Sequence, residues 1–234
     1  MSHFLTRPIS FLLPLYMFLQ ACGGTDSNLA KNLLLLMQME KSNPSRGSSG
    51  NTDPGGEADP TPAAVIYIYQ GGSTTGAFAD SLLGGRWGAD MNCFENRPSS
   101  LLGMCNYYKA LVSIDTNDEI RDMPIVHDVP TDRVITSKSG TKIAENWADL
   151  LDGSLPVSLQ SAGVASGTVW WSFSQWDGQI YSGTDSLTCN FGTSGSSSYS
   201  GKLGRSDSTS TDWIGTSSGS GLCNISAPVM CLCY

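Results

Sequence analysis

The chain has 234 residues, of which 21 are acidic and 13 basic, so its formal net charge is −8. Nucleic acids and heparin-like polyanions are bound through clustered Lys and Arg, and this sequence contains no run of basic residues. The charge balance therefore argues against a polyanionic partner and favours solubility. The length and the 40% hydrophobic content are sufficient for one sizeable folded domain with additional segments.

The N-terminus predicts an export signal. Arg7 precedes an apolar run over residues 9–19, which is too short to span a bilayer comfortably and suits the core of a signal peptide. The run ends at Leu19-Gln20-Ala21-Cys22, which resembles a bacterial lipobox. We therefore expect residues 1–21 to be a lipoprotein signal peptide and Cys22 to carry the lipid that anchors the protein to the membrane. The alternative is an ordinary cleaved signal that happens to precede a cysteine.

Residues 22–64 are expected to hold the lipidated N-terminus, a short apolar helix and a flexible tether. The apolar residues of the segment 27–41 are consecutive, so a helix there would be apolar nearly all round and would lie near the bilayer or on a partner. A weakly ordered leader is the alternative for this segment. Residues 43–62 contain no large apolar side chain, so burial cannot offset their ordering entropy. They predict a tether, followed by a folded domain over residues 65–234.

The folded domain shows short elements of both kinds. Two proline residues predict that Ile125 and Val126 lie in an extended segment, and Gly71-Gly72-Ser73 predicts a turn. A long irregular stretch rich in Gly, Ser and Thr is expected over residues 192–221. Short strands, two short helices and long loops together predict an α+β domain whose loops are functional or cross-linked. The strands are expected at residues 65–69, 107–114, 169–173 and 227–234, and the helices at residues 88–96 and 146–151.

The chain has seven cysteines, and six of them follow the predicted tether. None belongs to a pair of CxxC motifs, which argues against a zinc ribbon. In an exported protein the six are expected to form disulfides, although the sequence alone leaves many pairings open. Cys231 and Cys233 are two positions apart in a predicted strand, so their side chains should lie on the same face.

Several short blocks of the domain carry a family resemblance. The blocks, in chain order, are Arg86-Trp87-Gly88-Ala89-Asp90 with Cys93-Phe94, Tyr108-Lys109-Ala110-Leu111-Val112-Ser113, Pro124-Ile125-Val126, Asn146-Trp147-Ala148-Asp149-Leu150-Leu151-Asp152-Gly153, and Cys223 with Cys231. They resemble endostatin, the C-terminal domain of certain collagens, and the endostatin-like lipoprotein domains of pathogenic spirochaetes such as the leptospires. The resemblance covers residues 65–234. It implies a C-type-lectin-like fold in which the first and last strands pair and long disulfide-braced loops pack on one side.

The resemblance also implies a disulfide pattern. The two bridges of the family correspond to Cys93–Cys231 and Cys189–Cys223, and Cys105 and Cys233 are expected to form an additional third bridge. Links that close loops of this size stabilise a fold by about 4 to 5 kcal/mol each in the loop-entropy treatment. The zinc site of endostatin uses N-terminal histidines that this sequence lacks. The cysteines are therefore expected to be structural, and no metal or other cofactor is expected.

No catalytic residue is predicted. His127 and Asp128 are adjacent and suggest a general base, but neighbouring residues of an extended chain point to opposite faces, and no GxSxG motif marks a nucleophile. A surface or loop histidine is the preferred interpretation. Calcium-dependent sugar binding is also disfavoured, because the ligand triplets of such lectins are absent. Trp176-Asp177-Gly178 is the nearest sequence and indicates a turn.

Aromatic residues supply the candidate binding surface. Aromatic side chains dominate the energetics of protein interfaces and also stack on sugars. Alternation in a strand would bury one of Trp170 and Trp171, and most of the group is expected to belong to the core. A partner is therefore expected to bind any tryptophan that stays exposed, together with the loop 192–221. The candidates are Trp170, Trp171, Trp176, Tyr181 and Trp213.

The resemblance implies a function in adhesion. Relatives bind extracellular-matrix proteins such as laminin and fibronectin, or complement factor H, so the expectation is a surface adhesin anchored in the outer membrane. A periplasm-facing structural or carbohydrate-binding lipoprotein is the alternative. A third possibility is a hydrolase that uses a carboxylate pair such as Asp177 and Asp185.

Overall fold

The structure is a computed structural model, and it describes residues 65–79, 82–181, 185–216 and 219–234. The predictions for the signal peptide, the anchor at Cys22, the apolar helix and the tether lie outside the described residues. Within the described ranges, no helix combines the length and apolar character needed to span a membrane.

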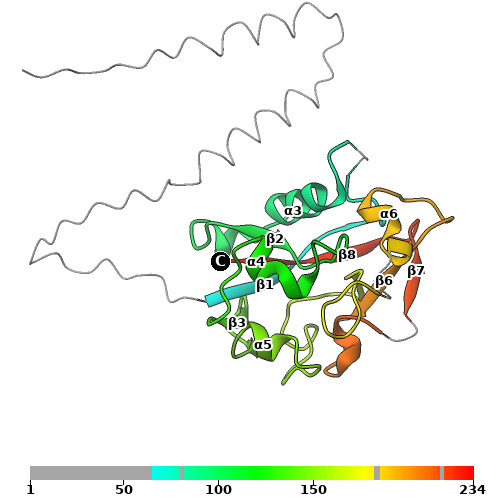
Figure 1. Cartoon of the computed structure of the whole chain (residues 1–234). Coiled ribbons are helices and arrows are strands. Elements are labelled where there is room, and N and C mark those ends of the chain that lie inside the picture. The colour runs from blue at the N-terminus through cyan, green and yellow to red at the C-terminus, as the bar shows by residue number, and fades with distance from the viewer. Residues whose placement is uncertain (1–64, 80–81, 182–184, 217–218) are drawn as a thin grey trace, which may run out of the picture. The chain divides into compact units, whose positions relative to one another are not determined.

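A five-stranded sheet forms the centre of the domain, in the strand order β2-β8-β1-β3-β4. The first and last strands of the domain, β1 and β8, pair in antiparallel fashion with Tyr67 opposite Cys233, while β1 and β3 run parallel. The two ends of the domain therefore meet at the middle of the sheet (Figure 1). The strands are β1 (Val65–Thr74), β2 (Tyr108–Ala110), β3 (Val134–Ser137), β4 (Lys142–Ala144) and β8 (Ala227–Cys233).

A second, antiparallel sheet contains the strands β5 (Val169–Trp171), β6 (Ser200–Arg205) and β7 (Ser220–Leu222). The prediction that residues 192–221 are irregular was therefore wrong for β6 and most of β7. The glycines in β6 are not turn residues but allow close packing. A Cβ on Gly201 would lie 2.6 Å from the Phe173 ring, and one on Gly204 would lie 2.6 Å from the Trp170 indole. A glycine can thus belong to a strand when aromatic rings pack directly on the backbone.

The helices are short. The longest, α3, overlaps the helix predicted at residues 88–96, lies against the sheet and buries Cys93. Asn146 caps α5 by accepting a hydrogen bond from the backbone N–H of Asp149 at 3.0 Å. The α-helical elements are α3 (Gly85–Glu95), α4 (Met123–Val126), α5 (Trp147–Leu150) and α6 (Cys189–Gly192), and the 3-10 helices are η1 (Ser99–Leu101), η2 (Ile120–Asp122), η4 (Asp185–Leu187) and η5 (Thr211–Trp213).

Two local predictions were wrong. Ile125 and Val126 belong to the helical turn α4 and not to an extended segment, because Pro124 lies in the first turn, where a missing N–H costs nothing. The predicted turn at residues 71–73 lies within β1, which continues to Thr74 past a register shift. Gly71 is needed there because a Cβ would come within 2.8 Å of the sulfur of Cys231.

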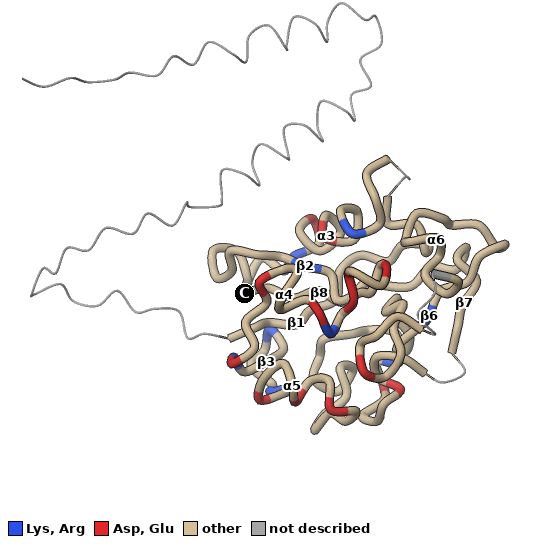
Figure 2. The backbone as a smooth tube through the Cα atoms, viewed as in Figure 1, with Lys and Arg blue, Asp and Glu red and all other residues tan. Residues whose placement is uncertain are grey.

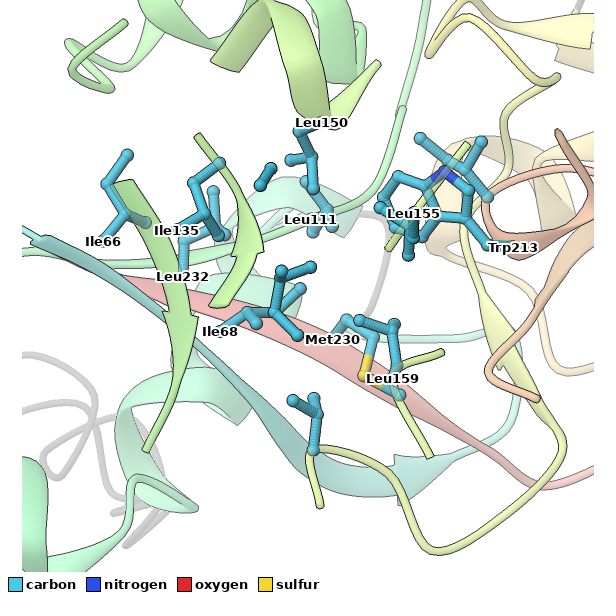
Figure 3. Close-up of a cluster of buried hydrophobic side chains, with 14 of the residues drawn as sticks. Ile66, Ile68, Leu111, Ile135, Leu150, Leu155, Leu159, Trp213, Met230 and Leu232 are labelled. Carbon is cyan, nitrogen blue, oxygen red and sulfur yellow. The ribbon is translucent and has the colours of Figure 1, made fainter. Parts of the chain in front are cut away.

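The two faces of the central sheet bury different clusters. Ile66 and Ile68 of β1 point into one cluster, whereas Tyr69 points into the other, as the alternation of a strand requires. The first cluster packs between the sheet, α5 and the loops that carry Leu155 and Leu159 (Figure 3). The second cluster lies between the sheet and α3 and includes all six described cysteines. Both faces of the sheet are therefore core.

Three disulfides connect the domain: Cys93–Cys231, Cys105–Cys233 and Cys189–Cys223, with Cα–Cα distances of 5.5, 5.5 and 5.6 Å. This is the pairing that the resemblance implied. The first two join α3 and the loop after it to one face of β8, as predicted from the spacing of Cys231 and Cys233. The domain is thus α+β, with two sheets, few short helices and three disulfides.

Candidate functional site

Three of the five candidate aromatic residues do not lie on the surface. Trp170, Trp171 and Trp213 are fully buried, which corrects their assignment to a binding surface. The Nε1–H of Trp170 donates to the backbone oxygen of Trp213 at 2.9 Å, and the two indole rings stack with centroids 6.0 Å apart. These residues hold η5 against β5 and cannot contact a partner.

Trp170 and Trp171 are both buried because β5 lies between the two clusters. Trp170 belongs to the cluster under α5, whereas Trp171 belongs to the cluster under α3 and contacts Phe173 with ring centroids 5.6 Å apart. The Nε1–H of Trp171 is satisfied by the backbone oxygen of Thr74 at 3.0 Å. Alternation places the two side chains on opposite faces, as expected, but each face is covered.

The other two candidates stay accessible to different degrees. Trp176 is 48% exposed and lies in the turn predicted from Asp177 and Gly178, where the Asp177 carboxylate accepts the N–H of Gln179 at 3.1 Å. Tyr181 is half-buried, and its ring lies 4.1 Å from Nζ of Lys202. The side chain of Asp185 lies outside the described part of the structure, so its predicted pairing with Asp177 stays a prediction.

A different set of apolar side chains is exposed around the Cys189–Cys223 bridge. Phe191 and Tyr199 are 38% and 45% exposed, and Leu222 and Ile225 are 50% and 38% exposed. Backbone hydrogen bonds join the chain segments that carry these residues. The backbone N–H of Cys223 donates to the backbone oxygen of Tyr199 at 3.0 Å, and Leu222 of β7 pairs with Ser200 of β6. We call the exposed residues of segments 189–201 and 219–225 the uncharged patch.

The name reflects a property of the sequence in this region. Residues 186–201 and 213–234 contain no Asp, Glu, Lys or Arg, and Lys202, which follows the first segment, is buried. In Figure 2, α6 and β7 carry no charged residue, whereas charges are distributed over α3 and the loops around α4 and α5. In a chain with a net charge of −8, the described surface residues of segments 189–201 and 219–225 are thus all uncharged.

The backbone of α6 is unusual. Cys189, Asn190 and Phe191 have φ values of 53°, 54° and 58°, so the turn is left-handed. This conformation is costly for residues with a Cβ and occurs mostly where surrounding contacts enforce it. Here the side-chain oxygen of Thr188 accepts the N–H of Phe191 at 3.1 Å, and the disulfide fixes Cys189. The strained turn holds Phe191 at the surface in a defined position.

His127 belongs to a polar network and is not a simple loop histidine. Its Nε2 donates to the carboxylate of Asp118 at 2.8 Å, and its side chain is only 11% exposed. Arg86 donates to both oxygens of the same carboxylate at 2.7 and 2.9 Å. Asp118 thereby links α3 to α4, and Asp128, the residue named with His127 in the sequence prediction, is exposed. The geometry gives this histidine a structural role.

The charge of Asp118 is stabilised by these partners. Burial by itself would raise the pKa of the carboxyl, but the hydrogen bond from His127 and the charge and hydrogen bonds of Arg86 outweigh it and lower the pKa below its ordinary value. Over the described part of the chain, no three His, Cys, Asp or Glu side chains are grouped so that they could hold a metal ion.

Comparison with known proteins adds no assignment. A comparison with protein-family models found no match, and a comparison with curated proteins found none either. The described residues form a disulfide-braced α+β domain with a buried aromatic core and an exposed uncharged patch.

Proposed function

We propose that this protein is a lipid-anchored surface adhesin whose endostatin-like, C-type-lectin-like domain binds another protein through the uncharged patch. The observation that carries the proposal is the position of Phe191, Tyr199, Leu222 and Ile225. They are exposed around one disulfide in a region without charge. Clusters of exposed apolar side chains on a soluble domain mark interaction sites.

The chemistry of the patch is that of a protein interface. Interface cores are depleted of charged residues and enriched in aromatic ones, and binding loops of antibodies combine Tyr with Ser, Gly and Asn. Residues 194–201, whose sequence is SGSSSYSG, have this composition. The left-handed turn and the Cys189–Cys223 bridge fix the backbone before binding, which reduces the entropy lost on association.

The fold assignment within the proposal has its own support. The pairing of β1 with β8 and the bridges Cys93–Cys231 and Cys189–Cys223 are the features that the resemblance to endostatin-like domains implied. The resemblance and the lipobox at Cys22 then suggest the setting. The protein would be anchored in the outer membrane and would bind matrix proteins such as laminin and fibronectin, or complement factor H.

A solid-phase binding experiment tests the patch. The oxidised full chain is titrated onto immobilised laminin, fibronectin and factor H, in parallel with a variant carrying Phe191→Asn, Tyr199→Ser and Leu222→Thr. Asn is chosen because it tolerates a positive φ. We expect saturable binding by the wild-type protein and a loss of about tenfold or more in the variant, as for hot-spot residues.

A matched control variant changes exposed apolar residues elsewhere. Leu102 and Met104 are 54% and 48% exposed in the loop after η1, and Leu102→Ser with Met104→Ser should bind like the wild type. If the wild-type protein binds none of the three host proteins, or if the control variant loses as much affinity as the patch variant, the proposal is wrong.

Protease treatment of intact cells tests the location. A surface protein is digested on intact cells, whereas a periplasm-facing lipoprotein is digested only after lysis. Replacement of Cys22 by Ser should release the protein from the membrane fraction if this cysteine carries the anchor. Protection of the domain until lysis would favour the periplasmic alternative over the adhesin.

A further inference from the structure

One side of the central strand β1 is only partly paired. β3 pairs with β1 only from Val65 to Ile68, because the chain turns toward β4 after Ser137. β1 itself continues to Thr74. The side of β1 that faces β3 is therefore not covered by a strand beyond Ile68.

The backbone groups of Gln70 point toward this open edge. The backbone of Met230 and Tyr234 is hydrogen-bonded to Leu111 and Tyr107, which flank β2. Because backbone groups alternate in direction along a strand, the N–H and C=O groups of Cys231 and Cys233 point the other way, toward β1. Tyr69 lies opposite Cys231 and faces β8 in return. Because backbone groups alternate along a strand, the N–H and C=O of Gln70 face the other side, where β3 has already ended.

A cavity of about 310 Å³ lies at this edge. Its volume is at the lower end of the range of ligand sites. Its wall combines the strand residues from Ile68 to Gln70 with Pro98, Lys138 and the loop of residues 163–166. Both faces of the sheet thus contribute walls to a slot along the strand edge.

Gln70 and Lys138, which line the slot, carry side-chain hydrogen-bond donors. The Gln70 side-chain oxygen accepts from the backbone N–H of Ser166 at 2.8 Å and from its hydroxyl at 3.3 Å, which directs the Nε2 donor of Gln70 elsewhere. Lys138 is exposed, and no carboxylate of the described residues lies within ion-pair distance of it. A cation without an acidic partner is notable in a chain of net charge −8.

We propose that this slot binds the C-terminal carboxylate of an extended peptide. The peptide adds to the edge of β1 as a short strand, exchanging hydrogen bonds with the N–H and C=O of Gln70, and its carboxylate pairs with Lys138. Lys138 immediately follows β3 and so lies at the end of the open edge nearest Ile68. A peptide whose C-terminal carboxylate is held there runs from the Thr74 end of the edge toward Ile68, which is antiparallel to β1. The site uses none of the residues of the uncharged patch.

Calorimetric titration of the oxidised full chain tests the site. The probe is N-acetyl-alanyl-valyl-alanine with a free carboxylate, and the same peptide with a C-terminal amide is the matched ligand control. We expect saturable binding of the acid and about tenfold weaker binding of the amide, because a charge-assisted hydrogen bond is lost. Lys138→Gln should reduce binding of the acid to the level of the amide.

Lys142→Gln is the protein control, since Lys142 lies in the same hairpin and is already paired with Glu145. It should leave binding of the acid unchanged. Equal binding of acid and amide, wild-type binding by Lys138→Gln, or no saturation at millimolar peptide would each overturn the proposal. Acetate binding as tightly as the peptide would overturn the strand pairing. The patch variant should bind the peptide normally, so failure here is distinct from failure of the adhesin proposal.

Discussion

Nε2 of His127 lies 2.8 Å from Oδ1 of Asp118, and this hydrogen bond joins α4 to the network that Arg86 builds from α3. Arg86 also donates to the backbone oxygens of Ala110 and Val112. The three side chains therefore connect α3, the end of β2 and α4. They supply polar cross-links in addition to the Cys93–Cys231 bridge, which joins α3 to β8.

The stability of this network should depend on pH. The pKa of Asp118 is lower in the folded protein than its ordinary value, so the carboxylate stabilises the fold above the unfolded pKa of about 3.9, and this contribution is lost as the pH falls through the lower folded pKa. Asp118→Asn should reduce the free energy of unfolding at pH 7 by about 2 kcal/mol. Urea denaturation at a series of pH values measures the difference.

The difference between Asp118→Asn and the wild type should shrink below about pH 4, because the Asp118 carboxyl of the unfolded chain then takes up a proton, and the folded carboxyl follows at lower pH. Asp132→Asn is the control, since Asp132 is exposed and has no ion pair among the described residues. A difference that stays constant down to pH 2 would show that the charge of Asp118 does not matter.

The disulfides should differ in their contribution to stability. Because Cys105–Cys233 stays closed, replacing Cys93 and Cys231 by Ser opens a loop of only about 14 residues, whereas replacing Cys189 and Cys223 opens one with a sequence separation of 34. Loop entropy therefore predicts losses of about 3 and about 4 kcal/mol in the free energy of unfolding. Chemical denaturation of the two double variants tests this order. A larger loss for the Cys93/Cys231 variant would contradict the loop-entropy explanation.

The tryptophans should separate into core and surface residues. Trp170→Ala removes a fully buried indole and should reduce the free energy of unfolding by about 3 to 5 kcal/mol. Trp176→Ala changes a half-exposed side chain and should alter it by about 0.5 kcal/mol or less. Denaturation followed by circular dichroism checks both values. Equal losses would mean that Trp176 is covered in solution.

Binding through the uncharged patch should be insensitive to salt. The patch contains no charged residue, so ionic screening has little to weaken. The dissociation constant for a matrix protein should change by less than about twofold between roughly 50 and 500 mM NaCl, a range over which the Debye length falls severalfold. A steep loss of affinity with salt would indicate that an electrostatic surface, and not the patch, binds the partner.

The sequence determined the local features of the domain. The β-branched and aromatic run at residues 65–69 predicted the first strand, and the spacing of Cys231 and Cys233 correctly placed both side chains on one face of the last. The helix that carries Cys93 and the short helix predicted at residues 146–151 were also evident from local residue types, whereas the cap that Asn146 forms appeared only in the structure. The predicted features depend on periodicity and residue type within one segment, which a sequence displays directly.

The tertiary structure decided what the segments do together. Both Trp170 and Trp171 are buried because β5 lies between two clusters, and strand alternation cannot reveal that both faces are covered. β6 is a strand although its glycines weaken the sequence pattern that predicts a strand. Aromatic rings from neighbouring segments occupy the space that side chains at these glycine positions would need. The uncharged patch is formed when a disulfide joins two distant segments. Burial and proximity arise from contacts between segments, so only the folded chain defines them.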